Sequence, residues 1–467
     1  MTELVPGSFR DPSGVLFVRD GVLYRQVNQR YREAWDLLTG SGLHRELVDE
    51  GLLVGHEEVS TELAPVAGAY RVLRPERIPF ISHPYEWCFS QLKDAARATL
   101  HIQRRALEKG MILKDASAYN IQFRGSRPVL IDTLSFAPYR EGEPWVAYRQ
   151  FCQHFLAPLA LMAHCDVRLG RLSNLFIDGV PLDLASRLLP RRTRLRFGLL
   201  THVHLHARSQ QRHAHAARRA GTARALHVSK AGLLGLVESL SSALEKLDWT
   251  PAGTEWSDYY DDTNYGSSGT EHKIELVRKL IGAVAPKTVW DLGANTGRFS
   301  RIAGEAGAHV VSWDLDPAAV EKNYRQARAE GSRTLLPLLL DLTNPSPAIG
   351  WAHEERMSLR ERGPVDLVMA LALVHHLAIS NNVPLPRIAA FFAALAPHLL
   401  IEFVPKHDSQ VQRLLATRED VFDQYTREGF EAAFATHYEV RDVQPIRDTE
   451  RVIYLLRRRS HPPDSGP

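Results

Sequence analysis

The sequence predicts an α/β protein in which a C-terminal doubly wound sheet follows an N-terminal α+β accessory domain. From residue 288 onward, short apolar strands alternate with helical segments at the pitch of a parallel sheet. Before residue 247 a few short strands precede long helical stretches, which is a different pattern. A chain of 467 residues is also too long for one ordinary core. We therefore expect an accessory domain at residues 1–247, the sheet domain at 248–459 and a disordered tail at 460–467.

Composition excludes several classes of protein. The apolar share of 44% and the charged share of 24% are those of a globular domain. A net charge of +3 over this length predicts no polyanion partner by global electrostatics. Three cysteines without paired spacing argue against a disulfide framework or a cysteine zinc site and fit a reducing compartment. No secretory signal and no apolar run of about 18–20 residues is visible, so we expect a soluble, cytoplasmic protein without a membrane partner.

Turn residues and periodicity predict the elements of the N-terminal half. Asp20-Gly21 between two apolar runs predicts a β-hairpin over residues 15–27. Apolar residues at helical intervals predict a long helix over residues 86–109, which ends at Lys109-Gly110. The other expected elements are a helix at 31–41, strands at 52–59 and 69–73, and mainly helical structure at 145–247.

Three polar residues follow the long helix at suggestive spacing. Asp115 and Asn120 lie in ILKDASAYNIQF, and Asp132 ends the run PVLID. This arrangement is similar to the catalytic loop and the metal-binding aspartate of the protein-kinase and aminoglycoside-phosphotransferase fold. The sequence departs from that pattern because it has no glycine-rich loop and no Val-Ala-Ile-Lys strand, and Leu113 and Thr133 stand where the family has other residues. The alternative is that Asp115 and Asn120 are ordinary turn residues. We expect a kinase-like shell without chemistry, serving as a scaffold or an acceptor-binding module.

The segment 187–224 contains ten arginines and no acidic residue. Such a segment can bind a nucleic acid or another phosphate-rich partner. Phe197 is its only Phe, Tyr or Trp, so no stacking platform for single strands is interleaved with the charge. We therefore favour a solvated helix face. His202, His204 and His206 do not have the spacing of helical zinc ligands, and no metal site is predicted.

Residues 288–317 form a strand–turn–helix–strand unit that ends in an acidic pair, the pattern of a nucleoside site in an open α/β sheet. The turn reads Asp291-Leu-Gly293-Ala-Asn295-Thr-Gly297. A dinucleotide turn would need Gly-x-Gly-x-x-Gly to wrap a pyrophosphate. The observed turn instead places an acid where it can meet a cationic amino-acid end. It resembles motif I of class I methyltransferases that depend on S-adenosylmethionine (SAM), and the resemblance covers residues 254–459.

That resemblance implies a Rossmann-like methyltransferase sheet, SAM as cofactor and a set of binding residues. Asp314, after the predicted strand 310–313, would accept hydrogen bonds from the ribose hydroxyls, and Leu315 and Asp316 would flank the adenine. Asp341-Leu342, after the strand 336–340, matches the acid near the adenine amino group. Further strands are expected at 365–370, 399–403 and 452–456. The implied cofactor-binding residues are Asp291, Gly293, Asn295, Gly297, Asp314, Leu315, Asp341, Leu342 and Ala370.

Methyl transfer to a hydroxyl or an ammonium needs alignment and the removal of a proton. His375 and His376 follow the fourth strand and have a suitable ordinary pKa, whereas the alternative is that one packs under the sheet and the other caps a helix. Glu402 could meet the acceptor or merely anchor a loop. A lid over SAM could include the residues that precede the motif, namely Tyr260, Asn264, Tyr265 and Lys273.

The segment 401–434, IEFVPKHDSQVQRLLATREDVFDQYTREGFEAAF, is similar to methyltransferase-like proteins grouped with the rhizobial nodulation protein NoeA. We therefore expect a SAM-dependent methyltransferase with an unidentified acceptor, which could be a small molecule, a protein or RNA. Two alternatives are a bifunctional kinase-methyltransferase and a non-catalytic scaffold that retains SAM as a structural ligand.

Overall fold

The structure, a computed structural model, describes residues 2–207, 227–251 and 267–460. It divides into two compact units. Unit 1 comprises Met1–Thr250 together with Ile349–Arg356, and unit 2 comprises Pro251–Ala348 and Met357–Pro467. The predicted boundary after residue 247 lies close to this division, but nothing in the sequence indicated that residues 349–356 pack with unit 1. Within unit 1, Arg10 donates two hydrogen bonds of 2.6 and 2.7 Å to Glu355.

A five-stranded antiparallel sheet forms one part of unit 1. Its order is β1-β2-β3-β5-β4. The predicted hairpin is confirmed, because Asp20 and Gly21 both have positive φ, as a two-residue turn between twisted strands requires. The strands are β1 (Thr2–Leu4), β2 (Gly14–Arg19), β3 (Val22–Asn28), β4 (His56–Val59) and β5 (Ala69–Pro75).

Two short helices, α1 (Arg32–Gly40) and α2 (Leu43–Asp49), follow β3. Trp35 of α1 is buried in a core cluster with Val27 and Leu73 of the sheet. His44 Nε2 lies 3.1 Å from His56 Nδ1, and the two imidazoles pack beside the Trp35 ring. The apolar side chains thus hold two histidines in a partly dry environment.

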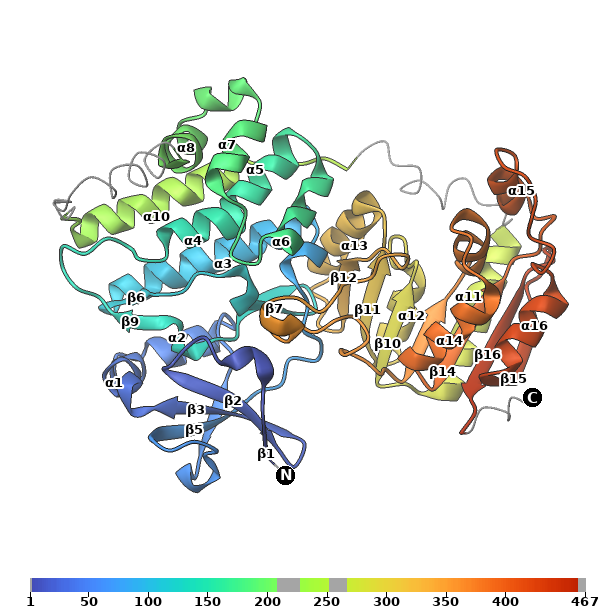
Figure 1. Cartoon of the computed structure of the whole chain (residues 1–467), viewed down its shortest axis with the longest axis horizontal. Coiled ribbons are helices and arrows are strands. Elements are labelled where there is room, and N and C mark those ends of the chain that lie inside the picture. The colour runs from blue at the N-terminus through green and yellow to red at the C-terminus, as the bar shows by residue number, and fades with distance from the viewer. Residues whose placement is uncertain (1, 208–226, 252–266, 461–467) are drawn as a thin grey trace. The chain divides into compact units, whose positions relative to one another are not determined.

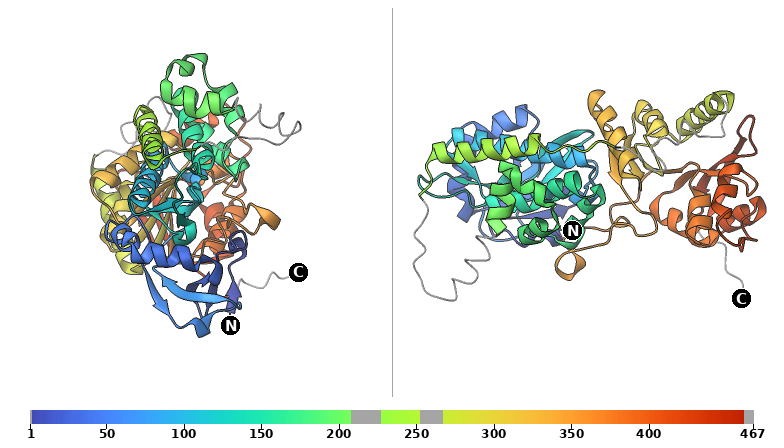
Figure 2. Two further views of the ribbon diagram at one scale, coloured as in Figure 1. Left: turned by 90° about the vertical axis from the view of Figure 1, so that its left-hand side faces the viewer. Right: turned by 90° about the horizontal axis from the view of Figure 1, so that it is seen from above.

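The long helix α3 (Phe89–Glu108) is the centre of the rest of unit 1. Helix α10 (Lys230–Glu245) lies along it (Figures 1 and 2) and is joined to it by the ion pairs Arg97–Glu245 and Arg104–Glu238. Two small antiparallel pairs follow α3. They are β6 (Met111–Leu113) with β9 (Phe136–Pro138), and β7 (Ile121–Arg124) with β8 (Arg127–Leu130). The shorter helices are α4 (Tyr148–Phe151), α5 (Ala157–His164), α6 (Leu172–Leu175), α7 (Leu182–Leu188) and α8 (Phe197–Leu199).

Unit 2 is built on a seven-stranded sheet of order β12-β11-β10-β13-β14-β16-β15, most of which is labelled in Figure 1. The first five strands in this order are parallel, and β16 and β15 are antiparallel additions at one edge. This arrangement confirms the predicted doubly wound sheet. The strands are β10 (Thr288–Leu292), β11 (His309–Asp314), β12 (Leu335–Leu339), β13 (Leu367–Ala370), β14 (His398–Phe403), β15 (Tyr438–Pro445) and β16 (Val452–Arg458).

Strand β15 was not predicted from the sequence. Its residues are mostly polar or charged, and they are mainly exposed or half-buried because the strand forms the edge of the sheet. The helices of unit 2 are α11 (Ser267–Val284), α12 (Arg298–Glu305), α13 (Pro317–Ala329), α14 (Leu385–Leu395), α15 (Ser409–Leu415) and α16 (Arg427–Ala435). Side chains of α11 and α12 bury one face of the sheet in a shared core, for example Val277 and Ile302 against Val310. Within the described ranges, no helix is long and apolar enough to cross a bilayer.

The pair His44–His56 predicts an acid-sensitive unit 1. Burial lowers the pKa of His56 from 6.5 to about 4, and the neighbouring His44 adds to this shift. The unfolded chain takes up a proton near its ordinary pKa, whereas the folded chain resists protonation. The stability due to this site is therefore complete above pH 6.5 and is lost as the pH falls toward 4. The loss, discounted for partial exposure, is about 2 kcal/mol. Urea unfolding of the full chain and of His56→Gln across this range measures it, and an equal pH dependence in both proteins would contradict the assignment.

Candidate functional site

A cavity of about 300 Å³ opens in unit 2 at the carboxyl ends of the parallel strands. It lies where the strand order reverses, since the chain passes from β10 to β11 and β12 on one side and then crosses to β13 on the other. Open α/β sheets bind ligands at this point. The polar or charged lining residues are Thr270, Lys273, Asp291, Asn295, Arg298, Asp314, Asp341, Thr343, His376, Ser380 and Asn381. The remaining lining residues are Gly293, Ala294, Phe299, Trp313, Leu315, Leu340, Leu342, Leu371, Ala372, Leu373 and Leu377.

The loop between β10 and α12 lines the cavity with Gly293, Ala294 and Asn295. Gly293, Asn295 and Gly297 all have positive φ, of 75°, 51° and 80°. A Cβ at Gly297 would lie 2.7 Å from Cγ of Asn323, so glycine is needed both for conformation and for space. Gly297 itself does not line the cavity. Its role is to start α12, whose first residues, Arg298 and Phe299, do line it.

Asp314 ends β11 and joins two loops. One carboxylate oxygen accepts a hydrogen bond of 2.7 Å from the Asn295 backbone N–H. The other accepts a hydrogen bond of 2.9 Å from the Asp316 backbone N–H. Burial raises the pKa of Asp314 to about 6, although these backbone hydrogen bonds oppose the shift. Each oxygen has two lone pairs, so the carboxylate can still accept hydrogen bonds from a ligand in the cavity.

Asp291 is the second-last residue of β10; it lines the same cavity and is 2% exposed. The Ser300 hydroxyl donates to it at 2.5 Å. Burial, with a smaller contribution from the charge of Asp314, raises the pKa of Asp291 to about 7, although the Ser300 hydrogen bond and Lys273 oppose the shift. A buried carboxyl with such a pKa gains most from a cationic ligand group placed beside it.

Asp341 follows β12, which is the neighbour of β11 in the sheet on the side away from β10. Both the amide and the hydroxyl of Thr343 donate to its Oδ1, at 2.9 and 2.6 Å. Leu315 and Leu342 line the cavity near the ends of β11 and β12. Ala370, in contrast, is fully buried as the last residue of β13 and does not line the cavity, although the next residues, Leu371 to Leu373, do.

The three predicted base candidates occupy different environments. His376 lines the cavity, and burial lowers its pKa to about 4. His375 is fully buried and does not line the cavity, and its two ring nitrogens have no hydrogen-bond partner among the described residues. Burial, with His376 next to it, holds the pKa of His375 well below its usual value. Of these two histidines, only His376 therefore lines the cavity.

Glu402, the third candidate, lies inside β14 and belongs to a chain of buried ion pairs. It accepts a hydrogen bond from Lys273 at 2.6 Å and lies 3.6 Å from Arg451, which donates two hydrogen bonds to Asp408 at 2.8 and 3.0 Å. The side chains of Glu402 and Arg451 are at most 1% exposed. Glu402 therefore lies behind the cavity wall, bonded to Lys273, and does not itself line the cavity.

Lys273 connects this network to the cavity. Its ammonium lies 4.8 Å from the centre of the Phe299 ring, and its side chain is one of the lining residues. Burial lowers the pKa of Lys273, whereas Glu402 opposes that shift. The sequence analysis assigned Lys273 to a lid, together with Tyr260, Asn264 and Tyr265, which lie outside the described residues. The structure places Lys273 in the cavity wall, on α11.

Other cavity residues had no signal in the sequence analysis. Ser380 and Asn381 reach the cavity because residues His376–Ser380 form a π-helical turn, which the sequence does not indicate. Ala372 has a positive φ of 51°, an uncommon conformation for alanine that is typical of constrained sites. Arg298 and Phe299 could have been found, since the residues after Gly297 open a helix that points at the site.

Unit 1 brings together the residues of the predicted catalytic-loop pattern. Asp115 accepts the Ser117 amide at 2.9 Å, and burial raises its pKa. Asp132 is ion-paired with Arg25 of β3 and accepts the Ser135 hydroxyl at 2.5 Å. Although burial acts to raise the pKa of Asp132, the Arg25 guanidinium and these hydrogen bonds hold it below its usual value. Within the described ranges no cluster of three or more His, Cys, Asp or Glu side chains could hold a metal ion.

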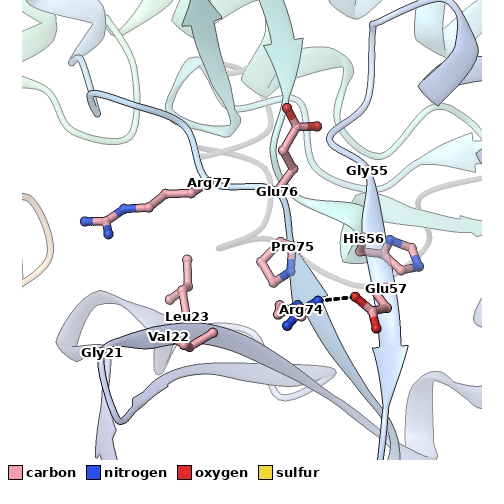
Figure 3. Close-up of a pocket in the computed structure, with 10 residues that line it drawn as sticks. All are labelled: Gly21, Val22, Leu23, Gly55, His56, Glu57, Arg74, Pro75, Glu76 and Arg77. Atoms are coloured by element: carbon pink, nitrogen blue, oxygen red, sulfur yellow. Dashed lines mark hydrogen bonds and ion pairs between the residues drawn. The ribbon is translucent and has the colours of Figure 1, made fainter. Parts of the chain in front are cut away.

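A second hollow, of about 450 Å³, lies in unit 1 between the β2–β3 turn, β4 and the end of β5 (Figure 3). Arg74 of β5 is paired with its cross-strand neighbour Glu57 of β4, as the dashed line in Figure 3 marks. Glu76, on the rim of the hollow, accepts a hydrogen bond from Arg124. Much of the charge that lines the hollow is therefore already neutralised by partners within the protein. The hollow is for this reason a weaker candidate site than the cavity of unit 2.

The histidines of the arginine-rich segment have structural partners. The ring nitrogens of His202 lie 2.7 Å from the Tyr148 hydroxyl and 2.9 Å from the Ser239 hydroxyl. Those of His204 lie 2.8 Å from Ser186 Oγ and 3.0 Å from Thr193 Oγ1. Both histidines lie in the π-helical turn Leu200–Leu205, which His202 joins to α4 and α10 and His204 joins to α7 and the turn Arg191–Leu195. Residues 208–224 of the predicted segment lie outside the described residues.

Comparisons with known proteins identify one relative along almost the whole chain. The protein is 36% identical over 460 residues to the nodulation protein NoeA of Rhizobium meliloti (strain 1021), covering 97% of this chain and 96% of NoeA. The similarity expected for residues 401–434 thus extends to nearly the full length. No protein-family model matches the sequence.

Solved structures overlap with less than half of the chain. Magnesium protoporphyrin IX methyltransferase (ChlM) from Synechocystis PCC 6803 with bound SAH is 17% identical, with a TM-score of 0.32, over 44% of this chain and 93% of its own. The N-methyltransferase NodS from Bradyrhizobium japonicum WM9 is 10% identical, with a TM-score of 0.31, over 41% of this chain and 97% of its own. At such TM-scores the overlaps carry no functional information.

The cavity loop predicts a sharp difference between two glycines. Gly297→Ala places a methyl group against Asn323 at a positive φ, so we expect unit 2 to lose about 2 kcal/mol of stability. Gly282→Ala in α11 meets no atom within 4 Å and should be neutral or slightly stabilising. Thermal unfolding of both variants is the measurement, and equal midpoints would contradict the role given to Gly297.

Proposed function

The chain belongs to the family of the nodulation protein NoeA, and we propose that it is a methyltransferase that uses SAM as its methyl donor. The observation that carries this proposal is the position of Asp314. Its carboxylate holds two loops at the carboxyl end of β11, in the wall of the cavity, and retains acceptor capacity toward the cavity. A ribose with two free hydroxyls is the ligand group that such a carboxylate suits.

The cavity residues fit the other parts of SAM. Leu315 and Leu342 supply apolar surface for the adenine. The second carboxylate oxygen of Asp341 can accept a hydrogen bond from the adenine amino group. Asp291, whose pKa is raised in the protein alone, matches the ammonium of the methionine end. Lys273, fixed by Glu402, is a cation in the same wall and would pair with the carboxylate of that end. No phosphate-binding turn is needed, because SAM has no phosphate.

When bound, SAM supplies a methyl group on a sulfonium, so the residues of the chain mainly need to align an acceptor and receive a proton. His376 faces the cavity and is neutral at pH 7, because burial lowers its pKa to about 4. We assign it the contact with the acceptor. His375 and Glu402 would act indirectly, His375 by packing under His376 and Glu402 by holding Lys273.

We further propose that unit 1 is a kinase-like scaffold or acceptor-binding module that does not transfer phosphate. The Arg25 guanidinium is paired with Asp132, the residue that a phosphotransferase of that fold would offer to magnesium. Ser135 takes up its other oxygen. This pairing favours the scaffold over the bifunctional kinase-methyltransferase.

The proposed function is tested with Asp314→Asn. This change keeps the shape of the side chain but turns one acceptor oxygen into a donor, so we expect SAM binding by calorimetry to weaken at least about 100-fold. Transfer of labelled methyl groups from SAM to cell-extract components should disappear with it. The control is Asp423→Asn, an exposed aspartate outside the cavity. Unchanged binding in Asp314→Asn would refute the site, and binding without any transfer would leave the non-catalytic scaffold.

Because the pKa of Asp291 is raised, we expect SAM binding to release a proton. The pKa of about 7 leaves Asp291 mostly protonated at about pH 6.5, where the amino group of the ligand is already an ammonium. The bound ammonium favours the carboxylate and lowers this pKa, so more than half a proton should leave. Calorimetry in buffers of different ionisation enthalpy measures the release, which should shrink in Asp291→Asn. Proton uptake, or an equal release in the variant, would show that Asp291 does not meet the ammonium.

A further inference from the structure

The segment Arg191–Phe197 of unit 1 exposes large apolar side chains among arginines. We call it the basic–apolar segment. It follows α7, forms a 3-10 turn and runs into α8, at the margin of unit 1 (Figure 1, green). Leu195 is 90% exposed and Phe197 is 75% exposed. Isolated exposed apolar residues are ordinary, but two such side chains within three residues form a patch that needs an explanation.

The arginines of the basic–apolar segment leave most of their charge unneutralised. Arg191, Arg192, Arg194 and Arg196 are all exposed, and none of them forms an ion pair with another described residue. Arg196 donates one hydrogen bond of 3.2 Å to the Lys246 carbonyl. The sequence contains no Asp or Glu between residues 184 and 237, so acidic neighbours along the chain are absent as well. The local field is therefore strongly positive although the whole chain is nearly neutral.

Buried contacts fix the conformation in which the basic–apolar segment exposes these side chains. Thr193, at the middle of the turn, is fully buried, and its hydroxyl lies 2.6 Å from the Pro190 carbonyl and 3.0 Å from His204. Gly198 packs directly against Ala243 of α10, and Leu199 is buried. These anchors alternate with the exposed residues, so the fold fixes one side of the segment to unit 1 and presents the other side outward.

We propose that the basic–apolar segment docks on an anionic lipid bilayer. Leucine and phenylalanine side chains enter the boundary between headgroups and acyl chains, and arginines pair with phosphates around them. A nucleic acid would use the arginines but would gain nothing from Leu195, and Phe197 offers a single ring where strand binding needs several. The sequence predicted no membrane partner because it has no spanning segment. Surface attachment needs only side chains such as these. This inference goes beyond methyl transfer and does not depend on it.

Vesicle flotation of the full chain tests the proposal. The probes are phosphatidylcholine vesicles with and without phosphatidylglycerol, and the chain should float only with the anionic set and less so as salt is raised. The triple change Arg191→Gln, Arg192→Gln and Arg194→Gln should lower the partition coefficient about tenfold or more. The double change Leu195→Ser and Phe197→Ser, which keeps every charge, should lower it several-fold.

Matched controls separate the segment from general surface properties. Arg30→Gln, Arg45→Gln and Arg333→Gln remove the same charge from other exposed positions, and Leu175→Ser with Val421→Ser removes exposed apolar side chains elsewhere. Both control proteins should float like the original chain, and circular dichroism checks that all variants fold. Failure to bind anionic vesicles would overturn the proposal. Equal flotation of either test variant and its control would also overturn it, as would binding of single-stranded RNA that needs the arginines but not Leu195 and Phe197.

Discussion

One carboxylate, that of Asp314, holds the candidate cavity together. It accepts the Asn295 amide from the loop after β10 and the Asp316 amide from the turn after β11. Two loops that start on neighbouring parallel strands are thereby tied at the sheet edge where their carboxyl ends meet. The loop that presents the Asn295 amide turns sharply, since Gly293 and Asn295 both have positive φ. A ligand that bonds Asp314 would meet a wall that is already ordered, which lowers the entropic cost of binding.

Behind this wall, a series of buried charged side chains, each paired with the next, runs from the cavity into the interior of unit 2. Lys273 bonds to Glu402, Glu402 lies beside Arg451, and Arg451 is bonded through two nitrogens to Asp408. Buried ion pairs contribute little net stability, but the loss of one partner leaves an uncompensated charge and costs about 3–5 kcal/mol. The network therefore mainly fixes the positions of its side chains and adds little to the free energy of unfolding. It fixes one cation, Lys273, in the cavity wall, and it explains why a carboxylate on β14 can matter without touching an acceptor.

The sequence was sufficient for the parts that local patterns determine. Runs of buried apolar residues located β10 to β14, and each acid at a strand end could be placed because parallel strands share one edge. The edge strand β15 escaped because exposure leaves it polar. The pairing of Lys273 with Glu402 joins residues that are 129 positions apart, and no spacing rule predicts such a contact. For the same reason, the sequence did not predict the association of residues 349–356 with unit 1 or the pairing of Arg25 with Asp132.

The central claim is that the cavity at the ends of β10 to β13 binds SAM through the acids at its rim. A crystal structure of the full chain grown with S-adenosylhomocysteine, the product of methyl transfer, tests it most directly. We expect density for the ligand in this cavity, with both ribose hydroxyls on Asp314, the adenine between Leu315 and Leu342, and the amino-acid end between Asp291 and Lys273. Ligand density at another place, or a cavity that stays empty at saturating ligand, would contradict it.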